Sequence, residues 1–352
     1  MGSLGDWRVV IAMGVLALVG FVAALPWLVR PLLRLALAPH YKIQIRGREN
    51  LPKTGPALLA VNHVSWIDGF ILVAATPLRG RALVSADYVD FPVIRWLARW
   101  VGLISVPVSG PRAQRAVIAA VRESLDRGEA IGIFPEGQLT RNGLTGPFYR
   151  GLEVMLAGRE HVPVIPVYLD NLWGSIFSFK GGKFFTKWPE GLRRTVTVVF
   201  GPPVPPPITA FGVRQAVLAA GVRAFEGRKE PPRPPETIDL SLPHLDHPTL
   251  GLLAASTADD DRGGVKQIGQ KDGTLGLAVP GVALRVVDDS GTSLPPGSEG
   301  RLQALVPGAA DWAETGHRGS LDRDGFVSVV PSRPPEAVHD GRASLHSEPA
   351  VE

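Results

Sequence analysis

The stretch "PALLAVNHVSWIDGFILVAA", residues 56–75, contains the pattern from which the rest of the fold can be predicted. Its first part is apolar up to His63, which is typical of a buried strand. Its last part, from Gly69, is an apolar run that we expect to be helical. His63 and Asp68 therefore lie between a buried strand and a helix. In parallel α/β sheets, ligands usually bind at this end of a strand.

Strand and helix patterns alternate along much of the chain. Short apolar or alternating segments predict strands, and longer segments with apolar residues at helical spacing predict helices. The alternation predicts an α/β fold with a mainly parallel sheet flanked by helices. The expected strands lie within residues 41–50, 56–63, 103–108, 130–134, 162–169 and 195–201, and the expected helices within 69–75, 90–102, 111–129, 151–158 and 211–227.

Composition and charge divide the chain further. Residues 1–235 carry 28 Lys and Arg against 15 Asp and Glu, a net +13, whereas residues 236–352 carry 9 against 18, a net −9. Segments of opposite charge suggest different roles. The chain has no cysteine, which excludes disulfides, thiolate zinc sites and a cysteine nucleophile. We expect a membrane anchor and interfacial segment (1–40), an α/β domain (41–228), a Pro-rich linker (229–236), a β-rich segment (237–330) and a disordered tail (331–352).

The N-terminal segment predicts a membrane anchor. Val9 to Val29 form an uncharged run of 21 residues, which at about 1.5 Å per residue spans roughly 30 Å, the thickness of a hydrocarbon core. Pro26 and Trp27 at its far end favour an uncleaved anchor over a signal peptide. Residues 25–37 either lie along the membrane interface or end a tilted span. Basic residues follow the run, so we expect a single span in the cell membrane with the α/β domain on the cytoplasmic side.

Two histidine–aspartate pairs have the same five-residue spacing, His63–Asp68 and His317–Asp322. The first follows a buried strand, whereas the second lies in a polar, turn-rich segment, and we therefore interpret the second as non-functional. Asp68 can accept a hydrogen bond from one ring nitrogen of His63 and leave the other as a general base.

A second polar turn follows the predicted strand at residues 130–134, in "IGIFPEGQLTRNG". Glu136 and Gly137 end that strand, and Arg141 follows in the turn. A carboxylate and an arginine at this position can bind a hydroxylated anionic head group.

These turns resemble motifs of a known family. "NHVSWID" (62–68) and "FPEGQLTR" (134–141) are similar to the first, His-X4-Asp, and the third motif of glycerolipid acyltransferases of the 1-acylglycerol-3-phosphate acyltransferase type. "GLISVPVSGPR" (102–112) and "VPVIPVYL" (162–169) resemble the second and fourth. Residues 172–189 and 196–205 are similar to the acyltransferase part of bacterial 2-acylglycerophosphoethanolamine acyltransferase/acyl-ACP synthetase fusions.

The resemblance implies direct acyl transfer without cofactor or metal. His63 would be the general base and Asp68 its orienting group. The donor would be acyl-CoA or acyl-ACP, and the acceptor a lysophospholipid or 1-acylglycerol 3-phosphate. Membrane phospholipid and, with an acyl-ACP donor, acyl carrier protein would be the partners, and nucleic acid is not expected. The residues implied in substrate binding are Glu136, Gly137, Arg141 and Arg112, the last of which comes later in its motif than the usual arginine.

An aromatic and lysine-rich segment, residues 177–188, suits a loop pressed into anionic lipid head groups. An ordinary hairpin with buried aromatic residues is the alternative. Nucleic-acid binding has a similar composition, but the predicted anchor favours lipid.

The C-terminal segment resembles a late stretch of acyl-adenylating enzymes over roughly residues 250–330, through residues 271–303 and "TGHRGSLDRDGFVSV" (315–329). His317 stands where that family has a ribose-binding aspartate, the phosphate loop is missing, and no lysine follows Lys271. We therefore expect a remnant without ligase activity. Two other classes remain open for the whole chain: a non-catalytic membrane adaptor, and a serine-type lipid hydrolase, which the missing G-x-S-x-G motif disfavours.

Overall fold

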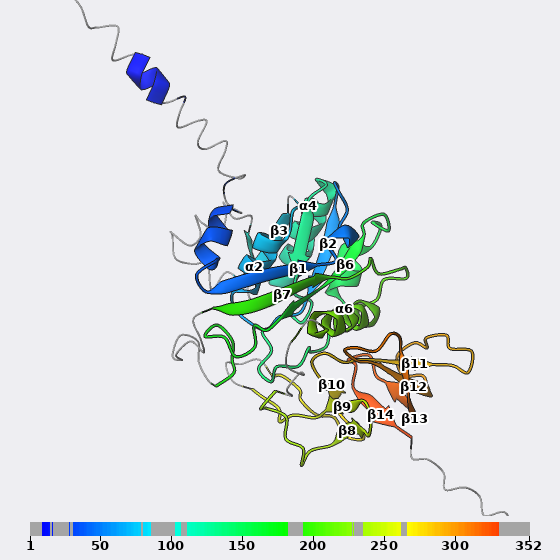
Figure 1. Cartoon of the computed structure of the whole chain (residues 1–352). Coiled ribbons are helices and arrows are strands. Elements are labelled where there is room, and N and C mark those ends of the chain that lie inside the picture. Colours follow the sequence, from blue (N-terminus) through cyan, green and yellow to red (C-terminus); the bar gives the residue numbers. More distant parts are fainter. Residues whose placement is uncertain are drawn as a thin grey trace, which may run out of the picture.

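The computed structural model shows an α/β domain followed by a smaller all-β segment (Figure 1). It describes residues 9–14, 16, 28, 31–78, 80–85, 103–106, 111–181, 193–226, 228, 235–261 and 266–330.

Seven strands form the central sheet, in the order β1-β7-β6-β2-β5-β3-β4. Among these described strands only β6 and β7 pair antiparallel, so the predicted mainly parallel sheet is confirmed and is mixed at this one point. The strands are β1 (Tyr41–Arg46), β2 (Ala57–Val61), β3 (Gly80–Ser85), β4 (Leu103–Val106), β5 (Ala130–Ile133), β6 (Val164–Asp170) and β7 (Arg194–Phe200).

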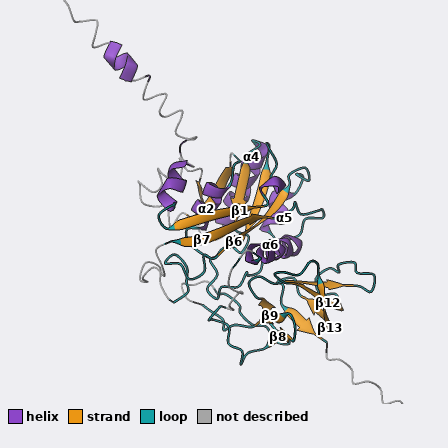
Figure 2. Ribbon diagram, in the orientation of Figure 1, coloured by secondary structure: helices purple, strands orange, loops and turns teal. Residues whose placement is uncertain are grey.

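Helices cover both faces of this sheet (Figure 2). The alternation of β2 sends Leu59 and Val61 toward α2 (Asp68–Ala75) and Leu58 and Ala60 toward the opposite face. All five residues of β2 are buried, which explains why the strand is apolar throughout rather than alternating. The helices on the opposite face are α4 (Pro111–Asp126), α5 (Gly151–Leu156) and α6 (Ala210–Phe225), and a short 3-10 helix, η1 (Arg48–Asn50), follows β1.

The C-terminal segment contains two small antiparallel sheets, which confirms its predicted β-rich character. One sheet consists of β8 (His244–His247), β9 (Gly251–Ala255) and β10 (Leu277–Ala278). The other consists of β11 (Ala283–Val287), β12 (Gly300–Leu305), β13 (Ala313–Leu321) and β14 (Val327–Val329).

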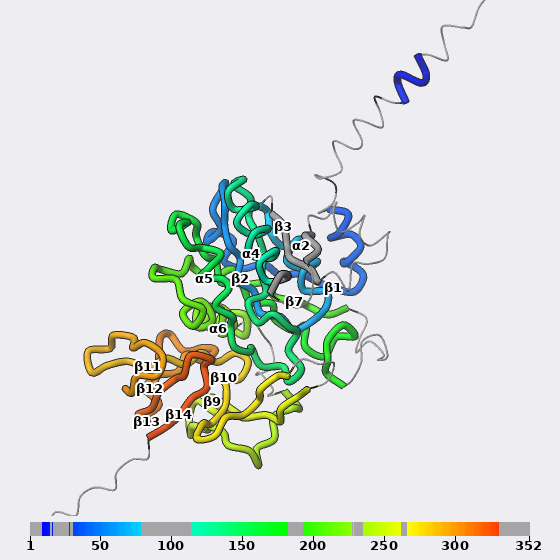
Figure 3. The backbone as a smooth tube through the Cα atoms, turned by 180° about the vertical axis from the view of Figure 1, so that it is seen from behind, coloured from blue at the N-terminus to red at the C-terminus, as the bar shows by residue number. Residues whose placement is uncertain are grey.

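Helix α6 joins the two parts of the chain. Its residues Val213 and Val217 belong to the core beneath the large sheet, whereas Leu218 and Val222 belong to the core of the C-terminal segment. Figures 1 and 3 show α6 between the large sheet and strands β9–β14 from opposite sides. The C-terminal segment therefore shares its core with the α/β domain.

Several predictions differ from the structure or cannot be compared with it. Strands β3, β8, β9, β10 and β13 were not predicted, and β2 ends two residues before His63. The predicted helix at 90–102 lies outside the described residues, as do the tail 331–352 and most of the linker.

The predicted membrane span is not confirmed. Within the part of the chain that the structure describes, no helix combines the length and the apolar character needed to cross a bilayer. Residues 15, 17–27 and 29 of the predicted span lie outside that part. Residues 31–37 are helical and rest on the domain, where Leu37 joins the core and the Nε of Arg34 donates to the Ala74 carbonyl at 2.7 Å.

Candidate active site

His63 and Asp68 lie together at the end of β2 as the sequence predicted. The Nδ1 atom of His63 is 2.9 Å from Oδ2 of Asp68, which is the first residue of α2. The His63 side chain is 20% exposed, whereas that of Asp68 is fully buried. A carboxylate fixed behind a partly exposed imidazole is suited to orient a general base.

The Asp68 carboxylate is held by the turn that leads into α2. Its Oδ2 accepts hydrogen bonds from the backbone N–H groups of Val64 at 2.7 Å and Ser65 at 2.9 Å, and its Oδ1 accepts from the Ser65 hydroxyl. This set of donors matches an ionised carboxylate, which only accepts hydrogen bonds. Nδ1 of His63 is therefore the donor of the pair, and Nε2 carries the lone pair that can take a proton.

The turn after β5 fixes the backbone of His63. The backbone N–H of His63 donates to Oε1 of Glu136 at 2.8 Å, and the His63 carbonyl accepts from the Thr140 N–H at 2.9 Å. The His63 ring also stacks on Phe134, with the ring centroids 4.0 Å apart and the planes 17° from parallel. The two predicted strand-end turns thus form one site, because β2 and β5 are neighbours in the sheet.

Glu136 faces the interior of this site. It is buried, and its Oε2 accepts from the Gly146 N–H at 2.8 Å while Oε1 binds His63. Burial raises the pKa of Glu136 to about 7, against the opposing effects of the two N–H donors and of Arg214. Both oxygens bind backbone groups, so the structure shows Glu136 positioning the backbone of His63, and a direct contact of Glu136 with substrate stays a prediction.

Arg214 supports the same turn from α6. It is fully buried, and its Nε and Nη2 donate to the carbonyls of Gly146 at 2.9 Å and Thr145 at 2.8 Å. Burial lowers the pKa of Arg214 to about 10. Its positive charge lies close enough to Glu136 to favour the carboxylate form of that residue.

Arg141 is placed differently from our expectation. Its Nη1 lies 3.1 Å from Oδ1 of Asp260 in the C-terminal segment, and its guanidinium lies 5.2 Å from the centre of the Phe179 ring. The Arg141 side chain is only 9% exposed. The guanidinium of Arg141 thus already has a carboxylate partner within the chain.

The structure says less about the other two predicted substrate-binding residues, Gly137 and Arg112. Gly137 has φ +66, and a Cβ there would lie 2.7 Å from the Tyr149 ring, so this turn requires glycine. Arg112 lies in the first turn of α4, and its side chain is outside the described part of the structure.

Sequence reasoning left several supporting residues unassigned, among them Ser65, Asn62, Phe134 and Arg214. The Asn62 side chain donates to the Leu169 carbonyl at 3.1 Å and accepts from the Leu169 N–H at 2.7 Å, which ties the site to β6. The role of Asn62 could have been suspected from a polar side chain at the end of a buried strand. The contacts of Phe134 and Arg214 depend on segments far apart in the chain, and the sequence carries no local signal for them.

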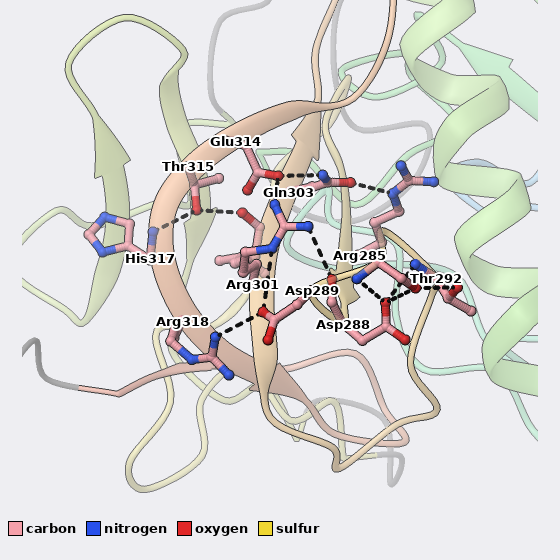
Figure 4. Close-up of polar contacts among 12 residues, drawn as sticks. Arg285, Asp288, Asp289, Thr292, Arg301, Gln303, Glu314, Thr315, His317 and Arg318 are labelled. Atoms are coloured by element: carbon pink, nitrogen blue, oxygen red, sulfur yellow. Dashed lines mark hydrogen bonds and ion pairs between the residues drawn. The ribbon is translucent and has the colours of Figure 1, made fainter.

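The second histidine–aspartate pair does not form. Asp322 accepts from Nζ of Lys271 at 2.6 Å and from the backbone N–H groups of Asp324 and Phe326, both at 2.9 Å. His317 lies in β13 rather than in a turn, and its ring points away from the polar cluster of β11–β13 (Figure 4). The interpretation of this pair as non-functional agrees with the geometry.

Comparison with known proteins identifies the class of the domain. Residues 42–170, which contain β1–β6 and both turns of the site, match the Acyltransferase family. Over these residues the chain is similar to acyltransferases.

Similar proteins with assigned names are lipid acyltransferases. A segment of the chain is 30% identical over 136 residues to the 1-acyl-sn-glycerol-3-phosphate acyltransferase BAT2, chloroplastic, of Brassica napus, covering 38% of this chain and 39% of that protein. It is 32% identical to the lyso-ornithine lipid O-acyltransferase of Pseudomonas aeruginosa, covering 40% of this chain and 51% of that protein. The matches thus span between two fifths and half of these relatives.

Among solved structures, the chain is similar to the 1-acyl-sn-glycerophosphate (LPA) acyltransferase PlsC of Thermotoga maritima. The identity is 20% and the TM-score 0.45, with 58% of this chain and 80% of that chain covered.

Proposed function

We propose that this protein is a membrane-bound O-acyltransferase that moves a fatty acyl group from a thioester, acyl-CoA or acyl-ACP, to the free hydroxyl of a lysolipid. The observation that carries the proposal is the 2.9 Å contact between His63 and the buried Asp68, in a segment that matches the Acyltransferase family. The acceptors named for the relatives, an acylglycerol phosphate and a lyso-ornithine lipid, are both lysolipids.

The proposed chemistry is direct transfer. Nε2 of His63 takes the proton of the acceptor hydroxyl as its oxygen attacks the thioester carbonyl, and Asp68 stabilises the imidazolium that forms. The tetrahedral intermediate then expels the thiolate, which takes the proton from the imidazolium, so that the products are an ester and a thiol. General-base assistance of this kind is typically worth about 10²–10⁴ in rate.

Membrane contact is supported by the helical residues 31–37. Leu32 and Leu35 are exposed there, while Leu37 packs in the domain core. An exposed apolar side on a helix with arginine suits the interface of a bilayer. The hydrogen bond from Arg34 to Ala74 joins this helix to α2, which carries Asp68, and so relates the proposed membrane side to the site.

The adenylating-enzyme remnant is part of the same proposal. We propose that residues 237–330 have no ligase activity and serve the acyltransferase domain instead. Lys271 supports this role, because it is bound to Asp322 and Asp324, both at 2.6 Å, and lies 4.6 Å from the centre of the Phe326 ring. These contacts give it a structural role within the segment.

The test is an acyl-transfer assay with the full chain in membranes, a labelled acyl thioester and a lysolipid. We expect labelled diacyl lipid from the unaltered protein and a large loss of it with His63→Ala. Labelled free fatty acid without acylated lipid would instead indicate a hydrolase. The absence of any labelled product, with lipid binding retained, would indicate a membrane adaptor.

A further inference from the structure

The C-terminal segment holds the turn that follows the third motif. The backbone N–H of Arg141 donates to Oε1 of Gln267 at 2.8 Å, and Nδ2 of Asn142 donates to the Thr257 hydroxyl at 2.8 Å. Nε2 of Gln267 also donates to Oδ1 of Asn142 at 2.8 Å. The C-terminal segment therefore packs directly against this turn.

Asp260 belongs to the same contact and binds the guanidinium of Arg141. The two side chains are 3.1 Å apart and are 9% and 17% exposed, so water screens the pair weakly. A charge-assisted contact in such surroundings is among the stronger polar interactions in proteins. The positive charge of Arg141 is thereby neutralised within the chain itself.

The backbone that precedes this ion pair contacts the backbone of the proposed base. The residue before Arg141, Thr140, donates its N–H to the carbonyl of His63 at 2.9 Å. A negatively charged group of an acceptor that reached Arg141 would have to displace the Asp260 carboxylate or lie beside it. The negative charges of the head group and of Asp260 repel each other when both lie against one guanidinium. This repulsion grows with the charge of the head group.

We propose that Asp260 is a specificity-determining residue that directs acyl transfer to lysolipids without a terminal phosphate monoester. A phosphate monoester carries about −1.5 to −2 charge at pH 7, and at Arg141 it meets an ion pair that has no net positive charge to offer. A zwitterionic phosphodiester head group carries no net charge and does not require Arg141. This proposal rests on the proposed function and narrows its acceptor class.

The experiment measures kcat/KM with two acceptors, a 1-acylglycerol 3-phosphate and a lysophosphatidylethanolamine, presented in the same neutral vesicles with the same donor. Asp260→Asn keeps the shape of the side chain and an oxygen for Arg141 but removes the negative charge. We expect the phosphate-to-zwitterion ratio of kcat/KM to rise roughly tenfold, mainly through a lower KM for the phosphate acceptor.

Two further variants make the result specific. Asp261→Asn removes the same charge from the exposed neighbouring residue, and we expect it to keep the unaltered ratio. Arg141→Gln added to Asp260→Asn removes the released guanidinium, and we expect the gain for the phosphate acceptor to disappear.

Three outcomes would overturn the proposal: an unchanged ratio in folded Asp260→Asn, an equal shift in Asp261→Asn, or a gain that survives the addition of Arg141→Gln. If Asp260→Asn does not fold, Asp260→Glu, which keeps the charge, is compared with Asp260→Ser, and the ratio must rise only in the latter. Absence of transfer to either acceptor by the unaltered protein would overturn the proposed function and this proposal with it.

Discussion

Asp68 connects the local structure of the site with its chemistry. It starts α2, accepts hydrogen bonds from the preceding turn and binds Nδ1 of His63, so one buried carboxylate fixes both the helix start and the orientation of the ring. The Val64–Ser65 turn that brings it back to His63 is local in sequence. This is why the pair could be predicted from a five-residue spacing next to a buried strand.

We expect Asp68→Asn to lower kcat by about 10²–10⁴ with little change in KM. The Asp68 carboxylate accepts a hydrogen bond from Nδ1 of His63, which leaves the lone pair on Nε2, and its charge stabilises the imidazolium. A neutral asparagine does neither as well. One oxygen would remain for the backbone donors, so we also expect a loss of about 1–3 kcal/mol in the free energy of unfolding. Kinetics and thermal unfolding of the same sample separate the two effects, and an unchanged kcat would contradict the role given to Asp68.

Glu136 predicts a pH dependence of stability. Its pKa is raised from 4.5 to about 7 by burial, so the folded protein binds this proton more tightly than the unfolded chain. The resulting stabilisation is fully present below about pH 4.5 and is lost as the pH rises through about 7, with a size of up to about 3 kcal/mol. Urea unfolding at a series of pH values measures it.

The comparison for this prediction is Glu136→Gln, which resembles the protonated acid and should remove that part of the pH dependence. The exposed Glu49→Gln should retain it. If the free energy of unfolding changes equally with pH in Glu136→Gln and in the unaltered protein, Glu136 does not titrate in this range.

At the scale of elements, the strands that are buried throughout could be predicted, whereas β13 could not. Strands β2, β5 and β6 are buried throughout, and each was expected. Strand β13 alternates buried with more exposed residues and contains two glycines and two charged residues in "AETGHRGSL", a composition that resembles a turn. Its pairing with β12 and β14 supplies the stability that its own composition does not indicate.

The contact between α6 and β6 leads to a prediction about glycine. A Cβ on Gly221 would lie 2.8 Å from the Tyr168 ring, whereas a Cβ on Gly151 in α5 would meet nothing within 4 Å. Gly221→Ala should therefore lower the free energy of unfolding by roughly 1–3 kcal/mol despite the better helix propensity of alanine. Gly151→Ala should be neutral or slightly stabilising in the same denaturation experiment. A stabilised Gly221→Ala would show that α6 can move away from the sheet at little cost.

At the scale of the whole molecule, the relation between the two segments could not be predicted from the sequence. The opposite net charges and the Pro-rich linker suggested separate parts. The structure instead places Asp260 against Arg141, 119 residues away in the chain, and gives both segments a share of α6. Such contacts depend on the packed fold and leave no local pattern. The ion pair of Arg141 is one of these contacts, and the direct binding of substrate by Arg141 stays a prediction.

The shared core predicts that the two segments unfold together. Leu218 of α6 is buried in the C-terminal core, and Leu218→Ala should lower the free energy of unfolding by about 2–5 kcal/mol. Tryptophan fluorescence and far-ultraviolet circular dichroism should report one coincident transition before and after the substitution. Leu240→Ala, at an exposed position, should have little effect. Two separate transitions would show that the segments are independent.

The most direct test of the central claim compares the rates of acyl transfer by His63→Ala and His317→Ala. Both variants remove a histidine that precedes an aspartate by five residues, but only His63 contacts its aspartate in the structure. We predict that His63→Ala loses at least about 100-fold in rate and that His317→Ala retains the rate of the unaltered protein. Equal rates in the two variants would contradict the assignment of His63 as the general base.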